Sequence, residues 1–181
     1  MLLSTPEMER GTPAPDFTLK DPQGESFALA DVQTDKGLVV AFICNHCPYV
    51  VAVAERMAAD AKMLQEEGIG FVAIMSNDYR DYPADAPPRM LEFAEKYGFT
   101  FPYLVDEDQS VGKAYGAVCT PDFFGFDGRG TLQYRGRLDD ARMGDATNRT
   151  PELLNAMRMI AETGEGPNKQ EPSMGCSIKW S

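Results

Sequence analysis

Apolar and polar residues alternate along the chain in blocks that predict strands followed by helices. The segment 36–44, KGLVVAFIC, is almost continuously apolar and rich in β-branched residues, which indicates a strand buried on both faces. The next apolar residues recur at helical spacing: Val50, Val53, Ala54, Met57, Ala61 and Leu64. A second buried strand is expected at 70–76. The chain therefore passes from a strand into a helix near residues 44–48.

The remaining pattern predicts further strands and helices. Their expected positions are two short strands across a turn at 22–24, a helix over 87–98, a strand at 101–105, a helix near 110–115, a hairpin formed by 122–126 and 131–137, and a helix over 151–162. This succession is typical of an α/β sandwich with a mixed sheet and helices on both faces. We expect one domain over residues 1–164 and a C-terminal tail over 165–181.

Composition narrows the classes of function. The 181 residues are 43% apolar, which is ample for a core that needs no disulfide staples. The 17 basic and 28 acidic residues give a net charge of −11, and no basic cluster is present, so neither nucleic acid nor a membrane surface is an expected partner. The N-terminus lacks the pattern of a secretory signal, and no apolar stretch approaches the ~20 residues of a spanning helix. We expect a cytoplasmic protein.

Four cysteines, at positions 44, 47, 119 and 176, then become candidates for chemistry. In a cytoplasmic chain, cysteines are more often catalytic or metal-binding than structural. Cys44 and Cys47 form a C-x-x-C motif at the strand-to-helix junction, and this spacing brings two sulfurs close enough to form a disulfide. The helix N-terminus favours a thiolate there, and the intervening His46 can tune the Cys44 thiolate.

Two other interpretations of these residues have to be weighed. Cys44 and Cys47 can be small buried apolar residues, since free cysteine packs well. Alternatively, Cys44, His46 and Cys47, with Cys119 or Cys176, can supply nitrogen and sulfur ligands to zinc. The chain has no second C-x-x-C and no H-x-x-H, so we expect no metal, and the absence of a glycine-rich phosphate loop argues against a nucleotide cofactor.

Four segments, in order along nearly the whole chain, resemble the redoxin group, the alkyl hydroperoxide reductase/thiol-specific antioxidant (AhpC/TSA) family, and most closely its peroxiredoxin-like thioredoxin-family branch. They are GTPAPDFTLKDPQG, FICNHCPYV, AYGAVCTPDFFGFD and PSMGCSIKW. The resemblance implies a thioredoxin-like three-layer sandwich with an N-terminal β-hairpin extension. It also implies a redox-active centre at the second segment and a cis-proline, Pro121, in the third.

Within this family, two alignments compete at the motif. In the thioredoxin-type alignment, Cys44 is an exposed nucleophile, Cys47 is the resolving thiol, and Thr120–Pro121 positions the substrate. In the peroxiredoxin alignment, Cys47–Pro48 carries the peroxide-attacking cysteine. Peroxiredoxins have a threonine where this chain has Cys44, and an arginine where it has Pro121. Both departures favour dithiol exchange.

The sequence therefore predicts a thiol–disulfide oxidoreductase whose partners are a protein or small-molecule disulfide and an external thiol reductant. The alternatives are a thiol-dependent peroxidase with an antioxidant role and a non-catalytic redox-sensing module.

Two features near the expected site stay open. Cys119 and Cys176 are possible additional redox thiols, and the tail that carries Cys176 is either a loose terminus or a segment docked over the active site. The loop 76–88, SNDYRDYPADAPP, is expected to be solvated and to border the substrate cleft.

Overall fold

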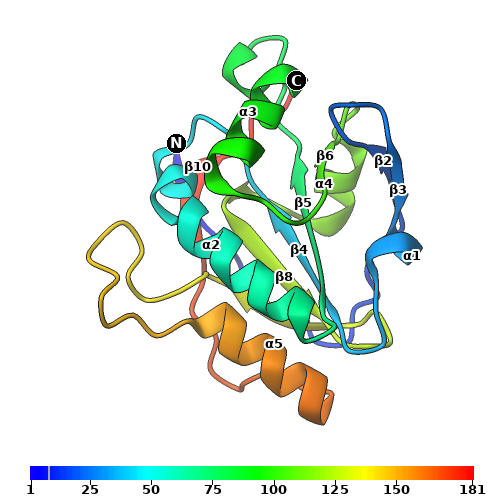
Figure 1. The fold of residues 1–181 in the computed structure, drawn as a ribbon, viewed down its shortest axis with the longest axis vertical. Helices are drawn as coiled ribbons and strands as arrows, with labels where there is room; N and C mark the ends of the chain where they lie inside the picture. The colour runs from blue at the N-terminus through cyan, green and yellow to red at the C-terminus, as the bar shows by residue number, and fades with distance from the viewer. Residues whose placement is uncertain (8) are drawn as a thin grey trace.

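The central sheet of the protein contains strands from both halves of the chain, in the order β3-β2-β6-β5-β4-β8-β9 (Figure 1). The computed structural model describes residues 1–7 and 9–181. The strands are Ser26–Ala28 (β3), Thr18–Lys20 (β2), Tyr103–Val105 (β6), Gly70–Met75 (β5), Leu38–Phe42 (β4), Asp122–Phe126 (β8) and Leu132–Gly136 (β9). β4 is parallel to β5 and antiparallel to β8, so the sheet is mixed, as predicted.

Helices cover both faces of this sheet. The helices are Leu29–Val32 (α1), Pro48–Glu66 (α2), Pro87–Tyr97 (α3), Ser110–Tyr115 (α4) and Glu152–Thr163 (α5), with a short 3-10 helix, η1, at Pro83–Asp85. Val39 and Ala41 of β4 pack toward α2, α3 and α5, whereas Val40 and Phe42 pack toward α1 and α4. In Figure 1, α2 and α5 cross the near face of the sheet. Because a strand buried on both faces carries apolar residues at every position, the unbroken apolar run of β4 is explained.

A second, smaller sheet joins the two ends of the chain to its middle. Its order is β1-β10-β7, with β1 at Leu2–Ser4, β10 at Met174–Ser177 and β7 at Cys119–Thr120. Both pairings are antiparallel. Part of the segment expected to be an extended tail is therefore a strand in the middle of a sheet.

The elements predicted from the sequence are found at the expected places, including the N-terminal hairpin of β2 and β3. No helix among the described residues is long and apolar enough to cross a membrane. The arrangement sets the end of β4, the start of α2, the loop after β5 and the small sheet around one point. That point is the C-x-x-C motif.

Candidate active site

The C-x-x-C motif connects the end of β4 to the start of α2. β4 ends at Phe42, and α2 begins at Pro48 with Cys47 as its N-cap residue. Proline suits this first position, since its missing N–H would have no partner in the first turn. Both cysteines are free thiols, 1% exposed at Cys44 and 0% at Cys47. The expectation of an exposed Cys44 is therefore wrong, because segments from distant parts of the chain cover the motif.

One of these covering segments is the Thr120–Pro121 turn, whose peptide bond is cis. The Cys44 Sγ lies 3.4 Å from the Thr120 Oγ1, and the Cys47 Sγ lies 3.3 Å from the Thr120 carbonyl oxygen. Both sulfurs thus contact the same residue, which is itself buried. The structure brings Thr120 and Pro121 to the dithiol, about seventy residues away in sequence.

The pKa values of the two thiols are shifted in opposite directions. The pKa of Cys47 is lowered to about 4 because its sulfur accepts hydrogen bonds from the Cys44 thiol, from the thiol and N–H of Cys176, and from the N–H of Val50. The pKa of Cys44 is raised well above its usual value by the proton it shares with Cys47, by burial and by the negative charge of Asp85. Since backbone N–H groups at a helix N-terminus stabilise an anion, negative charge in the reduced pair resides on Cys47.

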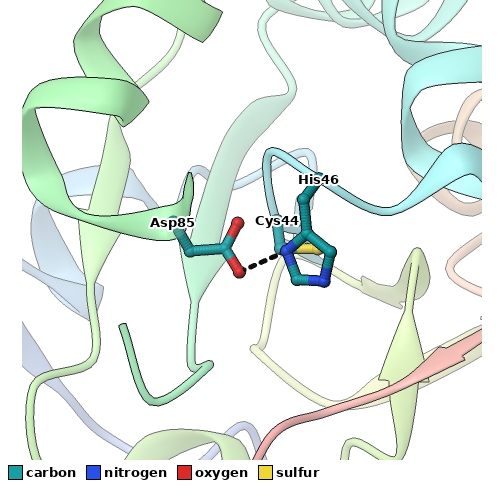
Figure 2. Close-up of side chains that lie close together, drawn as sticks. All are labelled: Cys44, His46 and Asp85. Carbon is teal, nitrogen blue, oxygen red and sulfur yellow. Dashed lines mark hydrogen bonds and ion pairs between the residues drawn. The ribbon is translucent and has the colours of Figure 1, made fainter. Parts of the chain in front are cut away.

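His46 turns toward the 76–88 loop, where it meets a buried carboxylate (Figure 2). Its Nδ1 lies 2.7 Å from the Asp85 Oδ2, and the side chains of His46 and Asp85 are 30% and 0% exposed. The imidazole also stacks on the ring of Tyr82, at 6.0 Å between centroids. A carboxylate that binds one ring nitrogen fixes the orientation of the ring. The His46 Nδ1 is therefore engaged by Asp85, and a tuning role of His46 toward the Cys44 thiolate stays a prediction.

The Asp85 carboxylate is held by groups from two segments. Its Oδ1 accepts the N–H of Asn45 at 2.8 Å, and its Oδ2 accepts the Asn77 amide at 2.9 Å. The Tyr103 hydroxyl in turn donates to the Asn45 Oδ1 at 2.9 Å. Both oxygens of this buried carboxylate therefore have hydrogen-bond partners. Asp85 is thus a site residue that the sequence did not reveal.

The expectation of a solvated 76–88 loop is wrong at three positions. Ser76, Asn77 and Asp85 are buried, whereas the segment between Arg80 and Ala84 is exposed. The loop is polar because these side chains satisfy hydrogen bonds within the site, so polarity alone misled the prediction. The sequence offers only one local mark for Asp85, which is its position two residues before the first of the two prolines that open α3.

Three side chains at this site offer donor atoms of the kind that zinc accepts. Atoms of Cys44, His46 and Asp85 lie within 4.8 Å of one another. The 2.7 Å between nitrogen and oxygen is a hydrogen-bond distance, and both carboxylate oxygens already accept N–H groups. The arrangement therefore fits a hydrogen-bonded histidine–carboxylate pair beside a thiol better than it fits an ion site.

The remaining two cysteines differ in their relation to the motif. Cys176 lies on β10 opposite Thr120 and packs against the core that contains Cys44 and Cys47. Cys119 is fully buried, its Sγ lies 3.8 Å from the Pro121 carbonyl oxygen, and burial and the charge of Asp122 raise its pKa to about 12. Cys176 therefore belongs to the thiol cluster, while Cys119 is held as a protonated core residue.

An arginine near this region, Arg135, is already paired. Its Nη2 lies 2.9 Å from the Asp122 Oδ2, and its guanidinium stacks at 4.5 Å over the ring of Phe124. These contacts bury Arg135 in the sheet beside Cys119. Arg135 is thus engaged as a structural ion pair.

The chain is similar to curated proteins that are named for thiol redox activity. The chain is 29% identical over 124 residues to the thiol-disulfide oxidoreductase ResA of Geobacillus thermodenitrificans, which covers 68% of this chain and 66% of that protein. It is 28% identical over 118 residues to peroxiredoxin Bcp of Escherichia coli, covering 65% and 70%. The chain spans slightly less than two thirds of the length of that ResA protein.

Solved structures confirm the thioredoxin-like fold. The thioredoxin domain of a thiol-disulfide oxidoreductase from Bacteroides vulgatus superposes with a TM-score of 0.66 at 16% identity, over 86% of this chain and 99% of that one. An uncharacterized conserved protein from Geobacillus kaustophilus superposes with a TM-score of 0.94 at 42% identity, over 100% of this chain and 97% of that one. The profile of the AhpC/TSA family matches residues 10–135. The chain therefore belongs to the AhpC/TSA family.

Proposed function

We propose that the protein is a thiol–disulfide oxidoreductase that cycles Cys44 and Cys47 between dithiol and disulfide. The observation that carries this proposal is the pair itself: two hydrogen-bonded sulfurs at a helix N-terminus, both in contact with Thr120 beside the cis-Pro121. A dithiol in this geometry can close to a disulfide with little movement of the backbone.

Cys44 is the nucleophile in this proposal. Cys47 is enclosed between the thiols of Cys44 and Cys176, whereas Cys44 lies beside the partly exposed His46. In the first step, the Cys44 sulfur attacks the substrate disulfide, and the substrate thiolate that leaves takes up the Cys44 proton. In the second step, the Cys47 thiolate attacks the Cys44 sulfur, which releases the other substrate sulfur as a thiolate.

Cys47 serves this cycle as the resolving thiolate. Its low pKa keeps it deprotonated at neutral pH, so it is ready to attack once the mixed disulfide at Cys44 has formed. An external thiol then reduces the 44–47 disulfide. A strongly stabilised thiolate favours the reduced pair, so we expect a comparatively oxidising couple.

A pocket beside Pro121 gives the substrate a place to bind. Apolar side chains contribute most of its lining, among them Tyr49, Leu138 and Met143, of which Met143 is half-exposed. Apolar clefts with a few polar groups are typical of ligand sites. The pocket suits an apolar side chain next to the cysteine of a protein disulfide better than it suits a small charged disulfide. A cytoplasmic location remains a prediction from the sequence.

Peroxide reduction is the second candidate, and the low pKa of Cys47 favours it. In that reaction the Cys47 thiolate attacks the peroxide, an alcohol or water leaves, and the resulting sulfenic acid condenses with the Cys44 thiol to give a disulfide and water. Pro121 occupies the position of the peroxiredoxin arginine, and the nearby Arg135 is paired with Asp122, so the group that polarises the peroxide is not supplied from there.

The two reactions are separated by single variants. We expect Cys44→Ser to abolish turnover of a protein disulfide by the reduced protein, and Cys47→Ser to accumulate a mixed disulfide at Cys44. Cys119→Ser is the matched control and is expected to keep the wild-type rate. If Cys44→Ser still consumes stoichiometric hydrogen peroxide rapidly and forms a Cys47 sulfenic acid, the peroxidase assignment is correct. Slow turnover with a large change of conformation on oxidation would favour the redox-sensing module.

A further inference from the structure

The C-terminal strand β10 is pressed against the turn that contacts the dithiol. In the antiparallel pairing of β10 with β7, Cys176 stands opposite Thr120. At the neighbouring position, a Cβ added to Gly175 would lie 1.8 Å from the Thr120 carbonyl oxygen. This close approach requires glycine, because any side chain there would push the two strands apart.

This packing brings Cys176 to the dithiol. The Thr120 carbonyl oxygen, opposite Cys176 in the pairing, is 3.3 Å from the Cys47 sulfur. Cys176 also packs against the core cluster that contains Cys44 and Cys47, and both Cys44 and Cys176 act to lower the pKa of Cys47. Neighbouring thiols of one cluster can form a disulfide when their side chains turn toward each other.

The three thiols differ in access from solvent. Cys44 and Cys47 are at most 1% exposed, whereas Cys176 is only partly buried. An external thiol therefore meets Cys176 before it meets either sulfur of the motif. A disulfide enclosed as fully as 44–47 is hard to reduce from solution unless the protein opens or passes the bond outward.

We propose that Cys176 is a third redox thiol that takes over the disulfide by exchange at Cys47, giving a Cys47–Cys176 bond that the external reductant reaches. This relay rests on the proposed function for its source of the 44–47 disulfide. In the exchange, the Cys176 thiolate attacks the Cys47 sulfur, the 44–47 bond breaks and Cys44 leaves as a thiolate. No electron is gained or lost. An external thiol then attacks Cys176 and Cys47 leaves as a thiolate, and a second external thiol releases Cys176 from the resulting mixed disulfide.

Oxidation of the motif changes the charge beside Cys176 in the direction that lowers the Cys176 pKa, as this step requires. In the reduced protein, burial and the charged Cys47 raise the pKa of Cys176 to about 11, while Lys179 and the N-terminal amine act in the opposite direction. Oxidation of the motif removes the Cys47 charge, so Cys176 becomes more acidic when its attack is required.

The relay is tested by oxidation of Cys44→Ser with stoichiometric diamide, acid quenching and peptide mass mapping. We expect a Cys47–Cys176 disulfide in most of the protein, its loss in Cys44→Ser/Cys176→Ser, and its retention in Cys44→Ser/Cys119→Ser. Absence of the 47–176 link in folded Cys44→Ser, with its three thiols free or joined between molecules, would overturn the proposal.

A second measurement separates the relay from the proposed function. Single Cys176→Ser is expected to form 44–47 normally with a disulfide substrate, but to be re-reduced more slowly by an external thiol than wild type. Equal re-reduction rates in the two proteins would also overturn the relay. If Cys44→Ser forms the 47–176 link but the wild-type protein turns over no disulfide substrate, the relay stands and the oxidoreductase assignment is refuted.

Discussion

The surroundings on the two sides of the α2 N-terminus shift the pKa values of its two cysteines in opposite directions. On the side of the η1 loop, Cys44 faces the buried anion of Asp85, which disfavours a second negative charge. On the side of the small sheet, Cys47 receives hydrogen bonds from the thiol and backbone of β10. The hydrogen bond between the two thiols contributes most to the difference in their pKa values, and the two flanks add to it, a carboxylate on one and N–H and S–H donors on the other.

The difference also explains how one fold can support either a dithiol or a peroxide reaction. A thiolate on Cys47 is the nucleophile that a peroxide needs, and the same thiolate can act as the resolving group after Cys44 has attacked a disulfide. Substitutions of the cysteines and of the residues on either flank can test this difference.

The largest effect is expected from removing the sulfur that carries the charge. Cys47→Ser should abolish the thiolate absorbance at 240 nm that titrates near pH 4 in the reduced wild type, because the pKa of Cys47 is lowered to about 4. If the absorbance persists in Cys47→Ser and is lost in Cys44→Ser, the charge has been assigned to the wrong flank.

The same pKa fixes the sign of a stability effect. Between pH 4 and the higher pKa of an unfolded cysteine, the unfolded state binds more protons at this position than the folded state does, so the Cys47 contribution to stability grows as pH rises and is lost as pH falls toward 4. Urea unfolding of reduced wild type and Cys47→Ser across this range should show the difference between them increasing with pH.

The next largest effect should come from separating the small sheet from the motif. Gly175→Ala places a Cβ against the Thr120 carbonyl oxygen, which should lower the free energy of unfolding by about 1–3 kcal/mol, the usual cost of overpacking. The displaced strand should also withdraw its donors, so the pKa of Cys47 should rise. Met174→Ala, at an exposed position of the same strand, is the matched control and should leave the pKa of Cys47 unchanged.

A smaller effect is expected from neutralising the opposite flank. Asp85→Asn removes the charge that helps to raise the pKa of Cys44, so Cys44 should become more acidic and alkylate faster at pH 8. An amide cannot accept at both ends, so about 1–3 kcal/mol of stability should be lost. Asp81→Asn, an exposed acid of the same loop, should change neither property. An unchanged alkylation rate in folded Asp85→Asn would refute the role given to this flank.

The smallest effect is expected at the fourth cysteine. Cys119→Ala should leave the alkylation rates of the other thiols within error, because its sulfur is fully buried and its pKa is raised to about 12. Mass spectrometry after brief alkylation at pH 8 should find Cys119 unmodified in the wild type. Rapid labelling there would show that the small sheet opens more readily than its hydrogen bonds suggest.

Much of the fold was accessible from the sequence because its signals are local. The continuous apolar run of β4, the helical spacing of α2 and the glycine that ends α3 each lie within one segment. The C-x-x-C motif could be recognised for the same reason, since its position at a strand-to-helix junction follows from the pattern around it.

The features that could not be predicted from the sequence depend on contacts between distant segments. β1 and β10 are short strands that pair with each other across more than a hundred residues of sequence, so no periodicity identifies them. Asp85 looked like a solvated loop residue because its burial is set by Asn45 and Asn77, and not by its neighbours in sequence. The acidity of Cys47 likewise depends on β10, which the sequence left as a tail.

The small sheet has a consequence for the order in which the protein is made. β1 and Thr120 both pair with β10, so both leave the ribosome before the strand that joins them is synthesised. Contacts this distant in sequence form late, because a long loop must close first. A nascent chain that already contains the C-x-x-C motif therefore carries its cysteines without the donors of β10. Until β10 is translated and paired, Cys47 lacks part of the stabilisation of its thiolate, and the redox site is completed only when β10 joins the small sheet.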